Sequence, residues 1–162
     1  MKALGFVGFR VDDRMIHGIV ATQWVPGFSA TRAMVIDDVA ATNDVMRSSL
    51  KMATPAGVAL SVIDHEKAVT NISNDKYANQ RVFCVFKTIK SAYDLFKAGV
   101  EIPHLNLGDV TQNVGETTTL GKTVRVSNEE KAMLREMRDA GVKITVKFRI
   151  EDSEVDVASL LD

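Results

Sequence analysis

The chain has 162 residues, of which 46% are hydrophobic and 25% charged, and its formal net charge is −1. That length fits one domain, residues 1–162, with a single sizeable core. The near-neutral charge provides no basic excess for nucleic acid, and the longest apolar runs are strand-sized, which argues against a transmembrane helix. The N-terminus lacks the basic region and long apolar core of a secretion signal.

The chain contains one cysteine, Cys84, inside the apolar run at residues 82–86. A lone cysteine cannot form an internal disulfide, which fits a reducing cytoplasm. Its apolar neighbours predict a small buried core residue rather than a reactive thiol.

Short apolar runs alternate with amphipathic stretches along the chain. Most of these runs are continuous, which is typical of strands covered on both faces in a parallel sheet. The expected strands span residues 3–9, 33–36, 58–63, 81–86, 104–107, 123–126 and 143–150. Because the last one alternates most clearly, we expect it to be an exposed edge strand that can pair with a second copy of the chain.

Helix signals lie between the expected strands. The expected helices span residues 17–25, 44–53, 66–73, 91–98 and 153–161, with one more from a capping box at Ser127 to Gly141. The first should stop at Pro26 and Gly27, Asp64 should cap the third, and Ser91 should cap the fourth.

This alternation of strands and helices predicts a doubly wound α/β fold, with a mostly parallel sheet of about seven strands and helices on both faces. Ligands bind such folds at the carboxyl ends of the strands. Segments that follow strands should share this edge: the His17 loop, Asp37–Asp38, Lys87 and the long stretch 108–121. A 14-residue loop there is either a binding loop or a mobile connection.

The most informative segment is Arg-Val-Asp-Asp-Arg-Met-Ile-His-Gly at residues 10–18. It follows an apolar run and opens a helical pattern, so His17 should lie at a helix start, where backbone N–H groups attract an anion. Arg14 can grip phosphoryl oxygens, and a neutral imidazole can act as a nucleophile near pH 7. The alternative is a helix-start histidine with a satisfied hydrogen bond.

Other functions are weaker alternatives. Receiver-type signalling domains use acidic residues after strands and a lysine after a later strand. This chain has a similar set of residues, namely Asp12, Asp13, Asp37, Asp38 and Lys87. A ligand-binding module without chemistry is a third possibility. We expect neither metal nor cofactor, because His65 and His104 lack ligand spacing and no glycine-rich loop ends in Gly-Lys-Ser/Thr.

The segment 10–18 resembles the active-site loop of IIB subunits of mannose/fructose/sorbose-type sugar phosphotransferase systems, whose usual form is Arg-Ile-Asp-Asp-Arg-Leu-Ile-His-Gly-Gln. The resemblance extends through residues 18–24, 37–40, 106–108 and 124–127. In that family a IIA protein passes a phosphoryl group from its own histidine to a IIB histidine, which then phosphorylates a sugar bound by the membrane IIC and IID subunits.

Applied to this chain, the resemblance implies that His17 is the phosphorylated nucleophile, through Nδ1, and that Arg14 steadies the phosphoryl oxygens. Asp12 would anchor the loop or orient the imidazole, whereas Asp13 is less clearly useful because a carboxylate repels phosphate. Gly18 completes the expected loop. The partners implied are a IIA protein and the IIC/IID complex, with the chain cytoplasmic and peripheral to the membrane.

Two positions depart from the family pattern. Ile19 replaces a usual Gln, so any polar contact from that position is missing, and Asp109 replaces a common second Gly in the loop that should face the phosphate. The segment 22–25 resembles members that serve amino sugars such as N-acetylgalactosamine.

Overall fold

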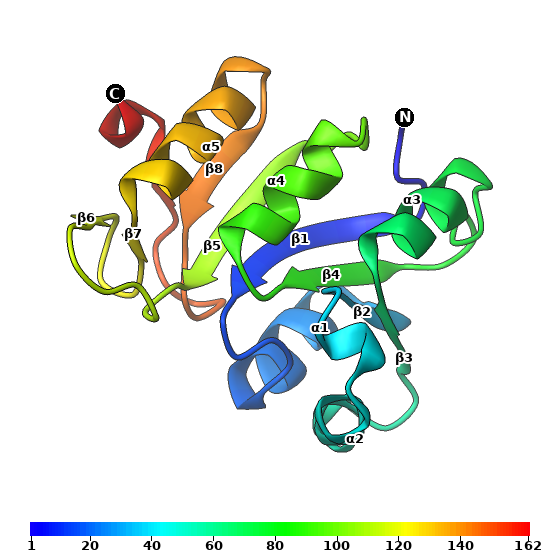
Figure 1. The fold of residues 1–162 in the computed structure, drawn as a ribbon. Helices are drawn as coiled ribbons and strands as arrows, with labels where there is room; N and C mark the ends of the chain where they lie inside the picture. Colours follow the sequence, from blue (N-terminus) through cyan, green and yellow to red (C-terminus); the bar gives the residue numbers. More distant parts are fainter.

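The computed structural model describes residues 1–162 and is built on a seven-stranded sheet in the order β3-β2-β4-β1-β5-β8-β9 (Figure 1). All neighbouring strands are parallel except β8 and β9. The strands are β1 (Phe6–Asp12), β2 (Arg32–Ile36), β3 (Ala59–Ile63), β4 (Val82–Phe86), β5 (His104–Asp109), β8 (Lys143–Val146) and β9 (Val155–Asp156). A separate antiparallel pair joins β6 (Thr118–Thr119) to β7 (Arg125–Val126).

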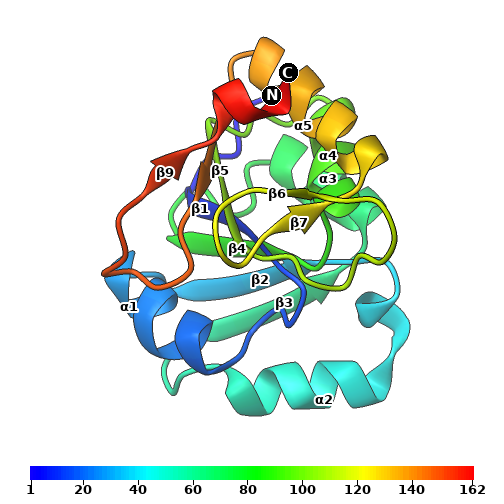
Figure 2. The same ribbon diagram turned by 90° about the vertical axis from the view of Figure 1, so that its left-hand side faces the viewer.

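Helices cover both faces of the sheet, and each face has its own apolar core (Figure 2). The helices of the larger core are α3 (His65–Ser73), α4 (Ile89–Lys97), α5 (Asn128–Asp139) and the 3₁₀ turn η3 (Ala158–Leu161). Those of the smaller core are the π-helical turn η1 (Val20–Trp24), α1 (Val25–Gly27), the 3₁₀ turn η2 (Ala40–Thr42) and α2 (Asp44–Ala53). The expected doubly wound α/β class is therefore confirmed.

The chain leaves neighbouring strands β1 and β5 toward opposite faces. β1 continues into η1 over the smaller core, whereas β5 leads through β6 and β7 to α5 over the larger core. In a doubly wound sheet, this divergence opens a crevice at the carboxyl ends of the two strands. The His17 loop and the segment after Asp109 both start at that crevice.

Most local signals in the sequence predict the observed elements. The helix at Asp44–Ala53 has the expected bounds, and the Asp64 side chain caps α3 by accepting from Lys67 N–H. Ser127 and Glu130 form the full capping box of α5. Cys84 is buried, as its apolar neighbours predicted.

The first strand lies three residues later than predicted. It begins after a turn in which Gly5 has a φ of +88°, a conformation that favours glycine, and it runs through to Asp12. Arg10 and Asp12 are both fully buried polar residues of this strand. Hydrophobicity alone assigned them to a loop, because charged residues are rarely buried unless they are paired.

Four expectations for the C-terminal half were wrong. Residues 125–126 pair with β6 rather than joining the main sheet, and 155–156 form β9 instead of opening a helix. The strand expected over residues 143–150 ends at Val146, because the carbonyls of Lys147 and Phe148 accept hydrogen bonds from the Arg10 side chain. Since β9 covers β8, the predicted exposed edge at β8 does not exist.

The other two corrections concern helices. Thr88, not Ser91, caps α4, and the buried Ser91 hydroxyl instead donates to the carbonyl of Ile36. The first helix extends through Gly27 and contains the π-helical turn η1, which matters because π-turns often occur at functional sites.

Candidate functional site

His17 lies where the chain turns from β1 into the first helix. Its carbonyl accepts the first helical hydrogen bond, from Ala21 N–H at 2.8 Å, as expected for a residue at a helix start. The turn before it is tight, because Met15 N–H donates to the carbonyl of Asp12 and Met15 adopts a φ of +59°. Nothing lies within 4 Å of the position where a Cβ would stand on Gly18, so the helix start is open.

Asp12 fixes the orientation of the imidazole. Its Oδ2 lies 2.8 Å from Nε2 of His17, and its Oδ1 accepts the backbone N–H of Arg14 at 3.0 Å. The carboxylate therefore both anchors the loop and orients the ring, the two roles that the sequence left open for it. Nδ1 of His17 has no hydrogen-bond partner in the protein, and the side chain keeps 16% of its surface exposed.

Arg10 is a residue of the site that sequence reasoning missed. Its guanidinium donates to Asp12 Oδ2 through Nη2 and Nε, at 3.1 and 3.3 Å, and Nη1 donates to Oδ1 of Asn106 at 2.9 Å. The Trp24 ring lies 4.6 Å from the guanidinium carbon. A Cβ on Gly108 would overlap the guanidinium, so glycine is needed there.

Burial of this ion pair has an electrostatic consequence. Both Arg10 and Asp12 are completely buried. Burial lowers the pKa of Arg10 against the opposing attraction of Asp12, but arginine starts so high that it remains charged near neutral pH. A buried charge is tolerated only when it is paired and hydrogen-bonded, and Arg10 and Asp12 meet this condition for each other beside His17.

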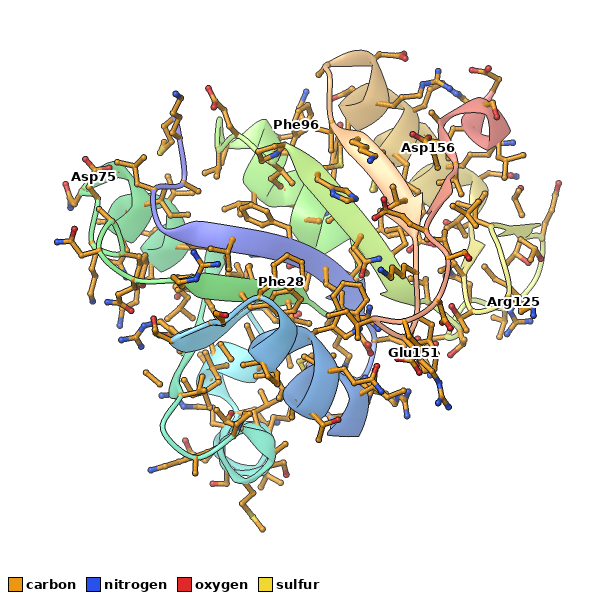
Figure 3. All side chains as sticks on the ribbon, turned by 180° about the vertical axis from the view of Figure 1, so that it is seen from behind. Phe28, Asp75, Phe96, Arg125, Glu151 and Asp156 are labelled. Carbon is orange, nitrogen blue, oxygen red and sulfur yellow. The ribbon has the colours of Figure 1, made fainter.

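Two carbonyls complete the support of Arg10. Those of Lys147 and Phe148 accept from its guanidinium at 3.0 and 3.1 Å, and Phe148 also accepts from the Trp24 indole N–H. Figure 3 labels Glu151 in this same loop after β8, seen from behind. Apart from Asp12, the hydrogen-bond partners of the Arg10 side chain lie 96 or more residues away, so the local sequence gave no signal for these contacts.

Arg14 projects from the loop toward solvent. Half of its side chain is exposed, and its Nε lies 3.2 Å from Oδ2 of Asp109 at the end of β5. Its two Nη groups have no hydrogen-bond partner in the protein. Arg14 is three residues before His17 in the chain. Most of its donors are free, as required of a group that binds phosphoryl oxygens.

Asp13 has a structural role. Its Oδ2 accepts the backbone N–H of Thr111 at 2.8 Å and the Thr111 hydroxyl at 3.2 Å, while its own N–H donates to the carbonyl of Asp109. These bonds tie the His17 loop to the segment after β5. Oδ1 of Asp13 is buried without a partner.

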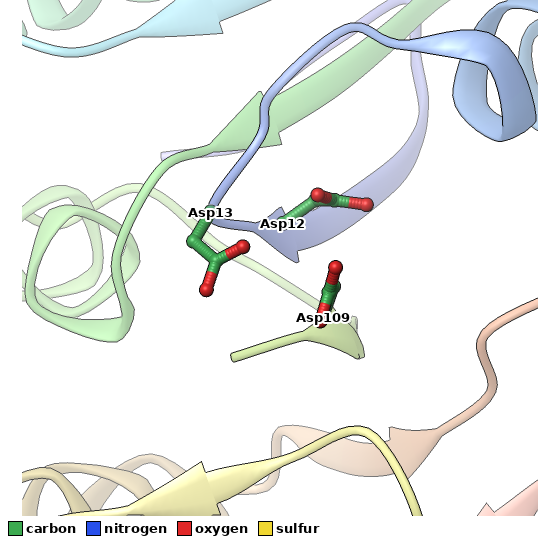
Figure 4. A group of neighbouring side chains, drawn as sticks. All are labelled: Asp12, Asp13 and Asp109. Atoms are coloured by element: carbon green, nitrogen blue, oxygen red, sulfur yellow. The ribbon is translucent and has the colours of Figure 1, made fainter. Parts of the chain in front are cut away.

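Asp12, Asp13 and Asp109 form an acidic cluster, with one oxygen of each within 4.8 Å of the others (Figure 4). Burial, together with Asp13 and Asp12, raises the pKa of Asp109 against the opposing effect of Arg14. Both oxygens of Asp12 already accept hydrogen bonds from Arg10, His17 and Arg14. The cluster is thus balanced mainly by guanidinium groups.

The other predicted rim residues do not join this site. The Asp37 side chain accepts the backbone N–H of Ala40, Asp38 bonds the His65 ring, and the Lys87 side chain makes no hydrogen bond or ion pair. His104 lies at the start of β5 and contacts Thr145. Of the predicted edge segments, the one after β5 is hydrogen-bonded to the His17 loop, through Asp13 and Thr111.

Known proteins match the chain over nearly its whole length. The model of the phosphotransferase system sorbose subfamily IIB component matches residues 6–162. The sorbose-specific EIIB component of Lacticaseibacillus casei is 32% identical over 94% of this chain and 93% of its own length. An N-acetylgalactosamine-specific IIB component of Escherichia coli is 30% identical, over 94% of this chain and 96% of its own length.

A solved structure agrees with these sequence matches. The IIB domain of the sorbose permease from Klebsiella pneumoniae superposes with a TM-score of 0.89 at 29% identity, over 96% of this chain and 95% of that one.

The fold and these relatives define a component of a sugar phosphotransferase system, a class that acts as phosphotransferases in sugar transport. Within that class, the chain belongs to the sorbose subfamily of IIB components. The resemblance found in the sequence is confirmed, and the receiver-type alternative is not supported. No helix of this chain has both the length and the apolar character needed to cross a membrane.

Proposed function

We propose that His17 accepts a phosphoryl group on Nδ1 from the phosphohistidine of a IIA protein and passes it to a sugar. The observation that carries the proposal is the asymmetry of the ring: Nε2 is bound to Asp12, whereas Nδ1 has no partner. A nitrogen can attack phosphorus only with an unused electron pair, and Asp12 leaves that pair on Nδ1.

The proton balance supports transfer between two imidazoles. The Nδ1 electron pair forms the new N–P bond while the donor's N–P bond breaks and its pair returns to the donor nitrogen. No proton has to leave His17, because Nε2–H remains shared with Asp12. The positive charge that develops on the phosphorylated ring faces the Asp12 carboxylate, which also forms an ion pair with Arg10.

Arg14 and the open helix start are proposed to receive the phosphoryl oxygens. The free Nη groups of Arg14 supply charged donors, and the first backbone N–H groups after His17 supply the positive end of a helix dipole. Gly18 leaves room for close approach to these N–H groups. Asp13 contributes by holding the loop, not by contacting phosphate.

The proposed partners are a IIA protein and the membrane IIC and IID subunits, with this chain acting as one IIB domain at the cytoplasmic face. Its specific activity would be that of a protein-Nπ-phosphohistidine–sugar phosphotransferase. Relatives named for sorbose and for N-acetylgalactosamine differ little in identity, at 32% and 30%, which supports selection of the sugar by the membrane subunits. The preference for an amino sugar remains a prediction from residues 22–25.

The test is phosphosite mapping after incubation with phosphoenolpyruvate, the general relay proteins and a IIA protein. We expect one phosphate on His17, stable in alkali and lost in acid. Phosphate on Asp37 or Asp38, labile to hydroxylamine, would instead support the signalling alternative. Absence of phosphate with an active IIA control would contradict the proposal and favour a binding module.

A further inference from the structure

We infer that Asp109 raises the phosphoryl-transfer potential of His17 by placing a negative charge against Arg14 and the incoming phosphate. The inference rests on the proposed phosphorylation of His17. It concerns Asp109, the position at which the chain departs from the second glycine common in the loops it resembles.

Register places Asp109 beside the reactive loop. β1 and β5 are parallel neighbours, and Asp12 and Asp109 are register partners at their carboxyl ends. Asp109 and Asp12 each contribute an oxygen to the acidic cluster, and Asp12 directly contacts the His17 ring. The Asp109 side chain is only 11% exposed, so water screens it poorly.

The contact with Asp109 leaves Arg14 free to bind phosphoryl oxygens but reduces the positive potential around its guanidinium. Asp109 accepts only from Nε, so both Nη groups remain free to reach phosphoryl oxygens. The carboxylate nevertheless cancels much of the positive charge that a phosphoryl group would meet. Counting Arg10 and Arg14 against Asp12, Asp13 and Asp109, the network carries one excess negative charge before any phosphate arrives.

This excess negative charge destabilises the phosphorylated state and not the free histidine. A phosphoryl group brings up to two negative charges, so repulsion from Asp109 raises the free energy of phosphohistidine relative to free histidine. When the N–P bond breaks, its electron pair returns to Nδ1 and the phosphoryl group leaves for the acceptor oxygen. The repulsion is then relieved, and onward transfer becomes more favourable.

The effect is measured by the partition of phosphate between labelled phospho-IIA and this chain, without phosphoenolpyruvate. Asp109→Asn removes the charge but keeps an acceptor for Arg14. We expect the partition to shift by about tenfold or more toward the phosphorylated chain, because a unit charge roughly 6 Å from a dianion contributes about tenfold even in water and poorer screening increases that factor. Asp139→Asn, which removes the same charge beside Arg138 at the end of α5, should leave the partition unchanged.

A pH profile separates this electrostatic role from a structural one. Burial and the cluster raise the pKa of Asp109, and the charged groups around it are Arg10, Asp12, Asp13 and Arg14. As the pH is lowered toward the raised pKa of Asp109, protonation of this carboxylate should move the wild-type partition toward that of Asp109→Asn. The pH dependence of the donor is common to both chains and cancels in their ratio.

The possible outcomes distinguish this inference from the proposed function. A partition unchanged in Asp109→Asn, or shifted toward IIA, would overturn the inference while the wild-type chain still accepts phosphate on His17. Failure of the wild-type chain to accept phosphate from an active donor would overturn the proposed function and this inference together. Urea unfolding of the variant verifies that the fold is intact.

Discussion

His17 and His65 lie in two regions that look alike locally but differ in chemistry. Each histidine follows a strand, at a helix start, and each bonds an aspartate, at 2.8 Å for His17 and 2.9 Å for His65. Their side chains are similarly exposed, at 16% and 21%. Exposure and a carboxylate partner therefore do not distinguish a reactive histidine from a structural one.

The use of the ring nitrogens does distinguish them. His65 bonds Asp38 through Nδ1 and reaches the carbonyl and hydroxyl of Ser91 through Nε2, so both its nitrogens are engaged. His17 uses only Nε2. The buried Asp12 leaves one nitrogen free to react, whereas Asp38, 70% exposed, takes part in a contact that joins β2, α3 and α4.

The largest expected effect comes from removing the free nitrogen. His17→Gln should abolish phosphate acceptance while the chain remains folded, because the side chain is partly exposed and a glutamine fits its space. His65→Gln should accept phosphate at the wild-type rate. Intact-mass measurement with phospho-IIA compares the two variants directly. Relay through His17→Gln, or loss of relay through His65→Gln, would contradict the assignment.

The second prediction compares the buried ion pair that holds Asp12 with an ion pair exposed on α4. Arg10→Met should lower the free energy of unfolding by about 3–5 kcal/mol, because Asp12 would remain buried without its guanidinium partner. Lys90→Met removes an exposed ion pair with Asp94 and should change the stability by at most about 0.5 kcal/mol. Urea unfolding of both variants measures the difference. A loss below about 1 kcal/mol in Arg10→Met would mean that the buried pair does not support the site.

A smaller effect is expected from Arg14, which contacts the site from solvent. Arg14→Ala should slow phosphate acceptance by about 10- to 100-fold through loss of charged donors, equivalent to about 1.4–2.7 kcal/mol of activation free energy. The stability of this variant should change by less than about 1 kcal/mol, because the Arg14 side chain itself is half-exposed. Single-turnover transfer from phospho-IIA measures the rate. A wild-type rate would exclude Arg14 from phosphate binding.

The sequence predicted those parts of the site that depend on neighbouring residues. His17, Asp12 and Arg14 lie within six residues, and a strand followed by a helix start is a local pattern. The Ser127 capping box and the Asp64 cap were predicted for the same reason. The fold class followed because continuous apolar runs between amphipathic stretches leave few alternatives to a parallel sheet.

The parts that could not be predicted depend on pairings distant in the sequence. Arg10 looked like the start of a polar loop, because its partners Asn106, Lys147 and Phe148 come close only in the folded sheet. Those same bonds ended the last predicted strand early. Asp109 was recognised as a departure from the family, but its contact with Arg14 required the register between β1 and β5.

The smallest expected effect is a pH dependence that separates His65 from a third histidine, His104. Burial lowers the pKa of His65, but its bonds to Asp38 and Ser91 outweigh burial and raise that pKa overall. Its contribution to stability is therefore complete below the unfolded pKa of about 6.5 and is lost as the pH rises through the folded pKa. His104 has the opposite sign, because burial lowers its pKa and its contribution is lost as the pH falls.

Unfolding free energies at pH 6 and 8.5 should expose this difference in sign. His65→Gln should lose stability relative to wild type mainly at pH 6, by less than about 1 kcal/mol, because Asp38 is largely solvated. The difference in unfolding free energy between wild type and His104→Gln should become smaller as the pH falls, because the wild type loses the His104 contribution there. An equal loss in His65→Gln at both pH values would show that the imidazole holds α3 and α4 together without its charge, which would make the contrast with His17 one of geometry alone.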